Sequence, residues 1–140
     1  NKLSKTRFLA VIGASGSGKS SLVKSGLLPA LHSGYLAIAG SGWNICTFRP
    51  GNNPIGNLAS ALYSEEILTE ESINSFSVEF IESILRRNDQ GIGESIRQLS
   101  DLRKKNILIV VDQFEELFRF SKFEKKFFWI YSDLISFYNI

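Results

Sequence analysis

The stretch that most constrains the fold runs from Gly13 to Ser20 and reads GASGSGKS. It matches the pattern G-x-x-x-x-G-K-[ST], in which glycines let a loop turn back so that its backbone N–H groups point inward. This pattern needs a strand before it and a helix after it. An apolar run, Arg7–Ile12, precedes the loop, and leucines at helical spacing follow Lys19. The sequence therefore predicts a buried strand, a phosphate-binding loop and a helix in direct succession.

Each position of this loop has a predicted role. The backbone N–H groups and the positive end of the following helix would face phosphate oxygens. Lys19 would bridge the β- and γ-phosphates, and the Ser20 hydroxyl would ligate Mg²⁺, which prefers oxygen ligands. The expected ligands are thus a nucleoside triphosphate and Mg²⁺. The residues expected to contact the nucleotide are Gly13, Ala14, Ser15, Gly16, Ser17, Gly18, Lys19, Ser20 and Ser21.

A second part of the site is predicted at Asp112. The residues Ile107–Val111 form an unbroken apolar run, mostly β-branched, which is typical of a strand buried on both faces. Ligands of an open parallel sheet bind beyond the carboxyl ends of its strands, so Asp112 should lie on the same rim as the phosphate loop. A carboxylate there can hold Mg²⁺ through a water. We therefore expect Ser20 and Asp112 to form the metal site.

Two glutamates follow this aspartate closely. Either Glu115 or Glu116 could orient or deprotonate an attacking water, although carboxylates at a helix start also serve simply to complement its positive end. We name both as candidate catalytic residues and prefer Glu116. Gln113 occupies the position where many P-loop ATPases carry the catalytic glutamate, which leaves open a protein that binds nucleotide without hydrolysing it.

The remaining pattern predicts an α/β protein. The run Trp43–Phe48 is a second strand candidate, and Asn53-Pro54 is typical of a helix start. Pro29 should kink or end the first helix. Strands separated by helices imply a parallel sheet with right-handed crossovers. Further helices are expected from Pro54 to about Ser64, within residues 67–88, from Ile92 to Leu102, and from Lys122 to about Phe137.

These motifs together resemble those of a known family. VIGASGSGKSSLVKSGLLPAL, then FRPGNNP, then ILIVVDQFEELF are similar to the novel STAND NTPases of bacteria, which are signal-transduction ATPases often fused to WD repeats. The resemblance covers roughly Arg7 to Phe120. It implies a P-loop NTPase three-layer sandwich with a parallel sheet, ATP as the nucleotide, and an ATP-driven switch that favours an assembled, oligomeric state. Glu115 and Glu116 fall where the family places its second acidic pair.

The resemblance also implies that the domain is truncated. The chain contains no Met and begins at Asn1, so we expect residues 1–140 to be part of a P-loop NTPase domain. The family places another strand, from beyond the Asp112 region, between the phosphate-loop strand and the Asp112 strand. That strand and a fused sensor or repeat domain are expected beyond residue 140.

Composition excludes several other classes. Sixteen basic and 14 acidic residues leave a net charge of +2, which does not indicate nucleic acid or an anionic membrane. We interpret the Lys122, Lys125 and Lys126 cluster as a solvated helix face. No apolar window is long enough for a membrane span. One cysteine, Cys46, permits no intrachain disulfide and fits a reducing, cytoplasmic compartment.

Other functions of a phosphate loop remain to be weighed. A GTPase needs an Asn-Lys-x-Asp motif after the aspartate strand, and none follows Asp112. A P-loop kinase usually has an arginine-rich lid, for which Arg86-Arg87 is a meagre candidate. Arg49, at the end of the second strand, could approach the rim but is more typical of a turn cap or a partner for an acid. An ATPase switch is preferred, with a nucleotide-binding scaffold or a kinase as alternatives.

Overall fold

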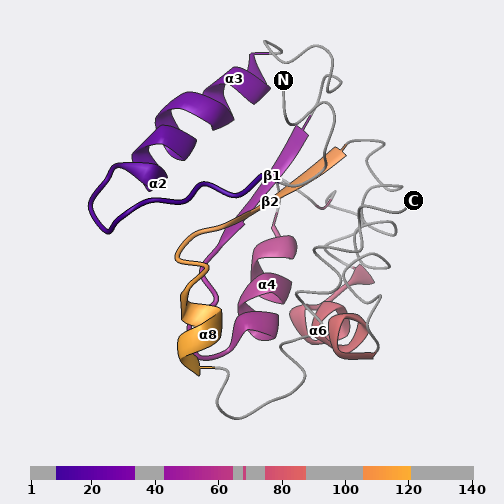
Figure 1. Cartoon of the computed structure of the whole chain (residues 1–140). Helices are drawn as coiled ribbons and strands as arrows, with labels where there is room; N and C mark the ends of the chain where they lie inside the picture. The colour runs from indigo at the N-terminus through magenta and orange to yellow at the C-terminus, as the bar shows by residue number, and fades with distance from the viewer. Residues whose placement is uncertain (1–8, 34–42, 65–67, 69–74, 88–105, 121–140) are drawn as a thin grey trace.

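The computed structural model of the chain describes residues 9–33, 43–64, 68, 75–87 and 106–120 (Figure 1). These residues form helices and two strands in a mixed order, which is compatible with the expected α/β class. In chain order the elements are α2 (Lys19–Ser21), η1 (Leu22–Leu27), α3 (Leu28–His32), β1 (Trp43–Phe48), α4 (Pro54–Leu62), α6 (Val78–Arg87), β2 (Asn106–Val111) and α8 (Glu116–Phe120).

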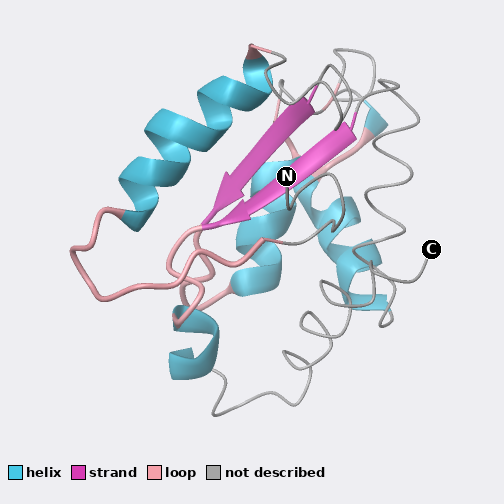
Figure 2. Ribbon diagram, turned by 45° about the horizontal axis from the view of Figure 1, so that its top comes forward, coloured by secondary structure: helices cyan, strands magenta, loops and turns pink. Residues whose placement is uncertain are grey.

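The two strands lie side by side and run parallel. Their register pairs Trp43 with Asn106 and Phe48 with Val111, so both strands end at the same edge. The prediction of parallel strands joined through helices is thereby confirmed for this pair. The continuous helix made of α2, η1 and α3 flanks the strands on one side, and α4 and α6 lie on the other (Figures 1 and 2).

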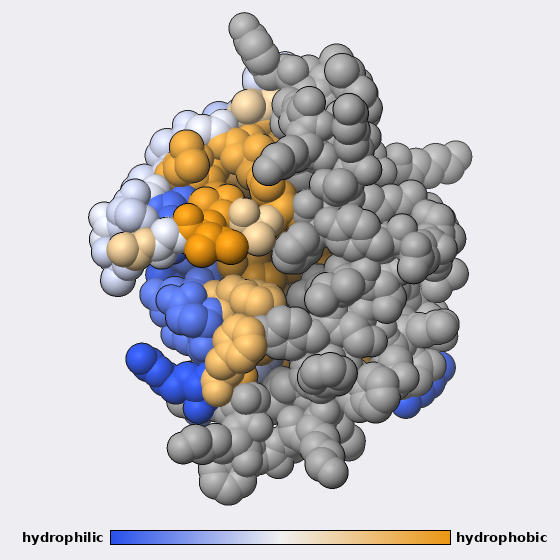
Figure 3. All heavy atoms as spheres, viewed as in Figure 1, coloured by the Kyte–Doolittle hydropathy of each residue, from blue (hydrophilic) through white to orange (hydrophobic). Residues whose placement is uncertain are grey.

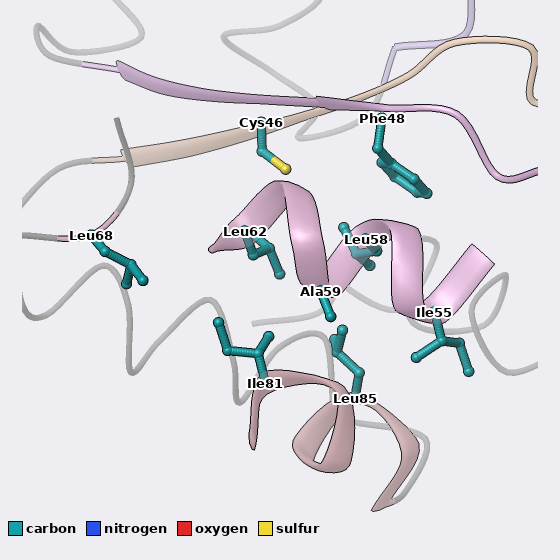
Figure 4. Packing of buried hydrophobic residues seen from close by; sticks show 9 residues of the cluster. All are labelled: Cys46, Phe48, Ile55, Leu58, Ala59, Leu62, Leu68, Ile81 and Leu85. Carbon is teal, nitrogen blue, oxygen red and sulfur yellow. The ribbon is translucent and has the colours of Figure 1, made fainter. Parts of the chain in front are cut away.

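The core lies between β1, α4 and α6 (Figure 4). Alternate residues of β1 face α4, while α4 is apolar enough to contact β1 on one side and α6 on the other. Burial of this apolar surface is the main favourable term in folding. Burial also raises the pKa of the Cys46 thiol to about 12, because this cysteine lies in the core. The buried cluster consists of Cys46, Phe48, Ile55, Leu58, Ala59, Leu62, Leu68, Ile81 and Leu85.

The start of α4 confirms the Asn53-Pro54 signal. The Asn53 side-chain oxygen accepts a hydrogen bond from the Gly56 N–H, which satisfies a donor at the open end of the helix. Pro54 occupies the first turn, where its missing N–H costs nothing. The helix ends at Leu62, slightly before the predicted boundary.

The strand expected over Arg7–Ile12 is not found where the structure describes that run. Residues 9–12 have no regular structure, and Ile12 is 91% exposed. A strand needs a neighbour for its backbone hydrogen bonds. The only strands of the described residues are β1 and β2, which pair with each other and not with this segment. Figure 3 shows apolar surface above a hydrophilic region on one face of the molecule. Among residues 9–22, the large apolar side chains that are exposed are Leu9, Val11, Ile12 and Leu22.

Pro29, which was predicted to kink or end the first helix, does not end it. The helix continues to His32, and the turns before the proline widen into the π-helical segment η1. In this segment the Leu28 N–H donates to the carbonyl of Val23 rather than to a nearer one. A proline ring clashes with the carbonyl four residues back in a regular helix, and a wider turn relieves that clash.

The other predicted helices, Ile92–Leu102 and Lys122–Phe137, lie outside the described residues, as does the Lys122, Lys125 and Lys126 cluster. Among the helices of the described ranges, none combines the length and apolar character that crossing a membrane requires.

Candidate phosphate and metal site

The loop of residues 13–18 has the backbone conformation that its glycines predict. Gly16 has φ 77° and Gly18 has φ 79°, in the left-handed region that glycine adopts without strain. Gly18 is also the N-cap residue of helix α2, which begins at Lys19. A side chain at Gly13 would place its Cβ 2.8 Å from the Ser17 hydroxyl. The loop thus uses glycine both for its turns and for close approach, and it leads directly into a helix N-terminus.

Lys19 folds back onto this loop. Its Nζ donates hydrogen bonds to the carbonyl oxygens of Gly13 and Ala14, both at 2.7 Å. The ammonium group is therefore held against the loop by two acceptors from the chain itself. Phosphate oxygens are stronger acceptors than carbonyl oxygens because they carry charge, so they could replace these two partners.

Ser20 and Asp112 meet across the site. The Ser20 Oγ donates to Asp112 Oδ1 at 3.0 Å, although the two residues are 92 positions apart in the sequence. Asp112 directly follows β2, and its N–H donates to the Phe48 carbonyl at the end of β1 at 2.9 Å. The rim of the parallel sheet therefore brings the predicted metal residues together.

Two cations also lie against the Asp112 carboxylate. Arg49 Nη2 is 3.3 Å and Lys24 Nζ is 3.5 Å from Asp112 Oδ2. Burial raises the pKa of this carboxyl group, since its side chain is only 12% exposed. The Ser20 hydrogen bond and the charges of Lys24 and Arg49 outweigh burial, so the pKa lies below its ordinary value. The group is a carboxylate at neutral pH.

The acidic pair after Asp112 is divided between two environments. Glu116 Oε2 accepts a hydrogen bond from the Gly51 N–H at 2.9 Å, which ties it to the turn after β1. Glu115 is exposed, and its backbone carbonyl accepts hydrogen bonds from helix α8. Gln113 has φ 57°, a left-handed conformation that is uncommon outside glycine and that turns the chain sharply after Asp112.

The turn after β1 is fixed from two sides. The Asn57 side chain donates to the carbonyls of Arg49 and Pro50, at 3.2 and 2.9 Å, and Glu116 holds the Gly51 N–H. Pro50 is fully buried. The backbone that carries Arg49 is therefore anchored to both α4 and α8.

Sequence reasoning missed Lys24 and Asn57 as site residues and gave Arg49 only a weak role. For Lys24 a signal existed, because it lies four residues after Ser20 and so shares its helix face. Arg49 pairs with an acid, which was one of the roles predicted for it, and that acid is Asp112. Nothing in the sequence indicated that Asn57 would reach back to the turn.

The residues present fit a hard cation such as Mg²⁺. A hydroxyl and a carboxylate oxygen in direct contact are the kind of ligands that Mg²⁺ takes while keeping several waters. Within the described ranges no group of three or more His, Cys, Asp or Glu could hold a metal by protein ligands alone. A metal at Ser20 and Asp112 would therefore depend on water and phosphate for its other ligands.

Comparison with known proteins identifies the family. The family model described as Novel STAND NTPase 1 matches residues 1–135. Because this match spans nearly the whole chain, the chain belongs to that family of NTPases, and the resemblance found in the motifs is confirmed. No curated protein and no solved structure matches the chain.

Proposed function

We propose that this member of the Novel STAND NTPase 1 family binds ATP with Mg²⁺ at residues 13–21 and Asp112, and acts as a nucleotide-dependent signalling switch. The observation that carries the proposal is the 3.0 Å contact between Ser20 and Asp112 at the end of a glycine-turned loop. Motif residues alone can match by chance. Here the Ser20 hydroxyl and the Asp112 carboxylate, from two distant segments, meet at one sheet edge.

Each group has a role in binding that follows from its chemistry. The N–H groups of the loop and the start of α2 would face the phosphates, and Ser21 would add a donor there. Lys19 would exchange its two carbonyl acceptors for β- and γ-phosphate oxygens. Ser20 and Asp112 would hold Mg²⁺, which neutralises phosphate charge.

Hydrolysis is proposed with Glu115 or Glu116 as the residue that activates water. Glu115 is exposed, and among the described residues its side chain has no hydrogen bond that would have to break, whereas Glu116 accepts a hydrogen bond from the Gly51 N–H. This difference favours Glu115 over Glu116, which the sequence alone had favoured. A scaffold that binds ATP without turnover is the second candidate, because Gln113 stands in place of the usual glutamate and Glu116 is already engaged.

A P-loop kinase is supported less. Arg86, the first residue of the proposed lid, bonds Glu82 at 2.8 Å and Asn53 at 3.3 Å, and so stabilises α6 against α4. Helix α6 packs into the core (Figure 4) and lies on the other side of the strands from the phosphate loop (Figure 1). Phosphate release from ATP with no acceptor present would separate an ATPase from a dedicated kinase, and tight binding without turnover would identify the scaffold.

Binding is tested with Lys19→Ala and a fluorescent ATP analogue in the full-length protein. We expect roughly a ten- to hundred-fold loss of affinity, because a charge-assisted contact contributes about 1.5–3 kcal/mol. Arg87→Ala is the matched control, since Arg87 is an exposed cation on α6. Unchanged affinity in a folded Lys19→Ala protein would reject the site.

The proposals on location, assembly and fused domains rest on the family alone. We propose a cytoplasmic protein in which the ATP-bound form assembles into an oligomer, with a fused sensor or repeat domain such as WD repeats supplying the input. Comparing the mass of the full-length protein with ATP and with ADP by light scattering tests the assembly. Equal masses in both states would contradict it.

A further inference from the structure

The two oxygens of the Asp112 carboxylate have different partners. Oδ1 accepts the Ser20 hydroxyl at 3.0 Å. Oδ2 faces Arg49 at 3.3 Å and Lys24 at 3.5 Å. The side chain is only 12% exposed, and among the described residues these three groups are the polar side chains that contact it. The carboxylate is thus neutralised by the chain's own cations.

The two cations come from separate elements. Lys24 lies in η1, one turn beyond Ser20, and Arg49 follows β1. Together they carry the same charge as one Mg²⁺. A divalent cation brought to the Ser20–Asp112 contact would meet like-charge repulsion from both of them, at a distance where such repulsion is large. Metal binding and the two ion pairs therefore compete for one carboxylate.

Lys24 and Arg49 can leave Asp112 without disturbing the backbone that carries Arg49. The side chains of Lys24 and Arg49 are 52% and 60% exposed, so water can solvate each charge once it leaves Asp112. The backbone at Arg49 is held by Asn57 and by the Glu116–Gly51 hydrogen bond, neither of which involves the guanidinium. Exchange at Asp112 thus needs only side-chain motion.

We propose that Lys24 and Arg49 are the resident counter-cations of Asp112, which Mg²⁺ must displace, and that they set the Mg²⁺ concentration at which nucleotide binds tightly. This inference rests on the proposed function. Both are positioning residues: they neutralise the carboxylate before the metal arrives and raise the metal concentration that the site requires. Removing either charge lowers that requirement, even though it also removes a cation that attracts the nucleotide.

The test compares Arg49→Gln and Lys24→Gln with wild-type full-length protein. A fluorescent ATP analogue is held at a fixed concentration while Mg²⁺ is titrated from a metal-free start, and the Mg²⁺ concentration at half-maximal enhancement of binding is measured. We expect each variant to lower this concentration about three- to ten-fold. Arg87→Gln removes the same charge away from the site and should leave it unchanged. Arg49→Lys keeps the charge and should restore the wild-type value.

A Mg²⁺ requirement that is unchanged or raised in both glutamine variants would overturn the inference. The two variants lie on different elements, so a folding defect in one, seen by circular dichroism, leaves the other decisive. If wild-type protein bound no nucleotide, the proposed function would fail, and the inference would be decided by Mn²⁺ titration of nucleotide-free protein followed by electron paramagnetic resonance. There, Arg49→Gln should bind Mn²⁺ more tightly than wild type, and Asp112→Asn should lose binding; equal affinity in wild type and Arg49→Gln would overturn it.

Discussion

The two sides of the site are built in different ways. On the loop side, residues 9–18 are exposed, and Leu31 is the single buried residue from α2 to α3. The other side, which we call the wall, consists of β1, α4 and the turn after β1. Strand β1 and helix α4 supply most of the buried cluster, and the turn contains the fully buried Pro50. The wall is fixed by apolar packing, whereas the loop joins it through polar contacts at Asp112.

This difference separates what holds the fold from what responds to a ligand. Regions with few buried apolar contacts open at lower free energy than the core. Charged and hydrogen-bonded contacts can be exchanged for phosphate or metal, but buried leucines cannot. The contacts that a ligand could replace therefore lie around Asp112, at one edge of the sheet, while the packed core beside them is unchanged.

The largest expected effect on stability comes from replacing a leucine with alanine on each of the two sides. Leu62 is fully buried and Leu22 is 65% exposed. Leu62→Ala should lower the free energy of unfolding by about 2–5 kcal/mol, since it removes apolar contacts and leaves a cavity. Leu22→Ala should change it by no more than about 0.5 kcal/mol. Urea denaturation of both variants measures this, and equal losses would break the comparison.

Substitutions of two glycines, one on each side, should have effects of intermediate size on stability. Gly18 has φ 79° and no atom near its missing Cβ, so Gly18→Ala should cost about 1–2 kcal/mol through backbone strain alone and should weaken ATP binding. At Gly56 a Cβ would strike the Asn53 side chain that caps α4. Loss of that cap should cost about 0.5–2 kcal/mol.

ATP affinity should distinguish the two glycine variants, although their losses of unfolding free energy should be similar. Thermal unfolding gives the two costs, and titration with the fluorescent ATP analogue gives the affinities. Gly56→Ala serves as the control, because its strain lies on the wall side and should leave ATP affinity at the wild-type value. An equal loss of affinity in both variants would mean that the loop has no special role.

The sequence was sufficient for features that depend on local pattern. The apolar run Ile107–Val111 was predicted as a strand and lies in β2, although its residues are partly buried rather than buried on both faces. The Asn53-Pro54 cap is predicted from two adjacent residues and is found at the start of α4. That Ser20 and Asp112 would share a rim followed from the rule that ligands meet parallel strands at their carboxyl ends. These inferences hold because one segment, or one general rule of topology, determines them.

Other features depend on partners that no local pattern reveals. Residues 9–12 look like a strand, but an apolar run becomes one only beside a neighbouring strand, and the described residues offer it none. The contacts of Arg49 and Lys24 with Asp112 depend on how far two side chains reach across the rim. The catalytic roles of Glu115 and Glu116 stay predictions.

The smallest expected effect concerns pH at the junction of the two sides. The folded-state pKa of Asp112 is depressed below the ordinary aspartate value of about 3.9. The stability that this carboxylate contributes is therefore fully present above that value and is lost as the pH falls through the folded pKa. Asp112→Asn lacks this contribution, so the difference in unfolding free energy between wild type and Asp112→Asn should shrink from pH 6 towards roughly pH 2–3. Denaturation curves across that range measure it. A difference that stays constant would mean that the cations and Ser20 do not stabilise the carboxylate, and the polar junction would then contribute nothing to holding the loop against the wall.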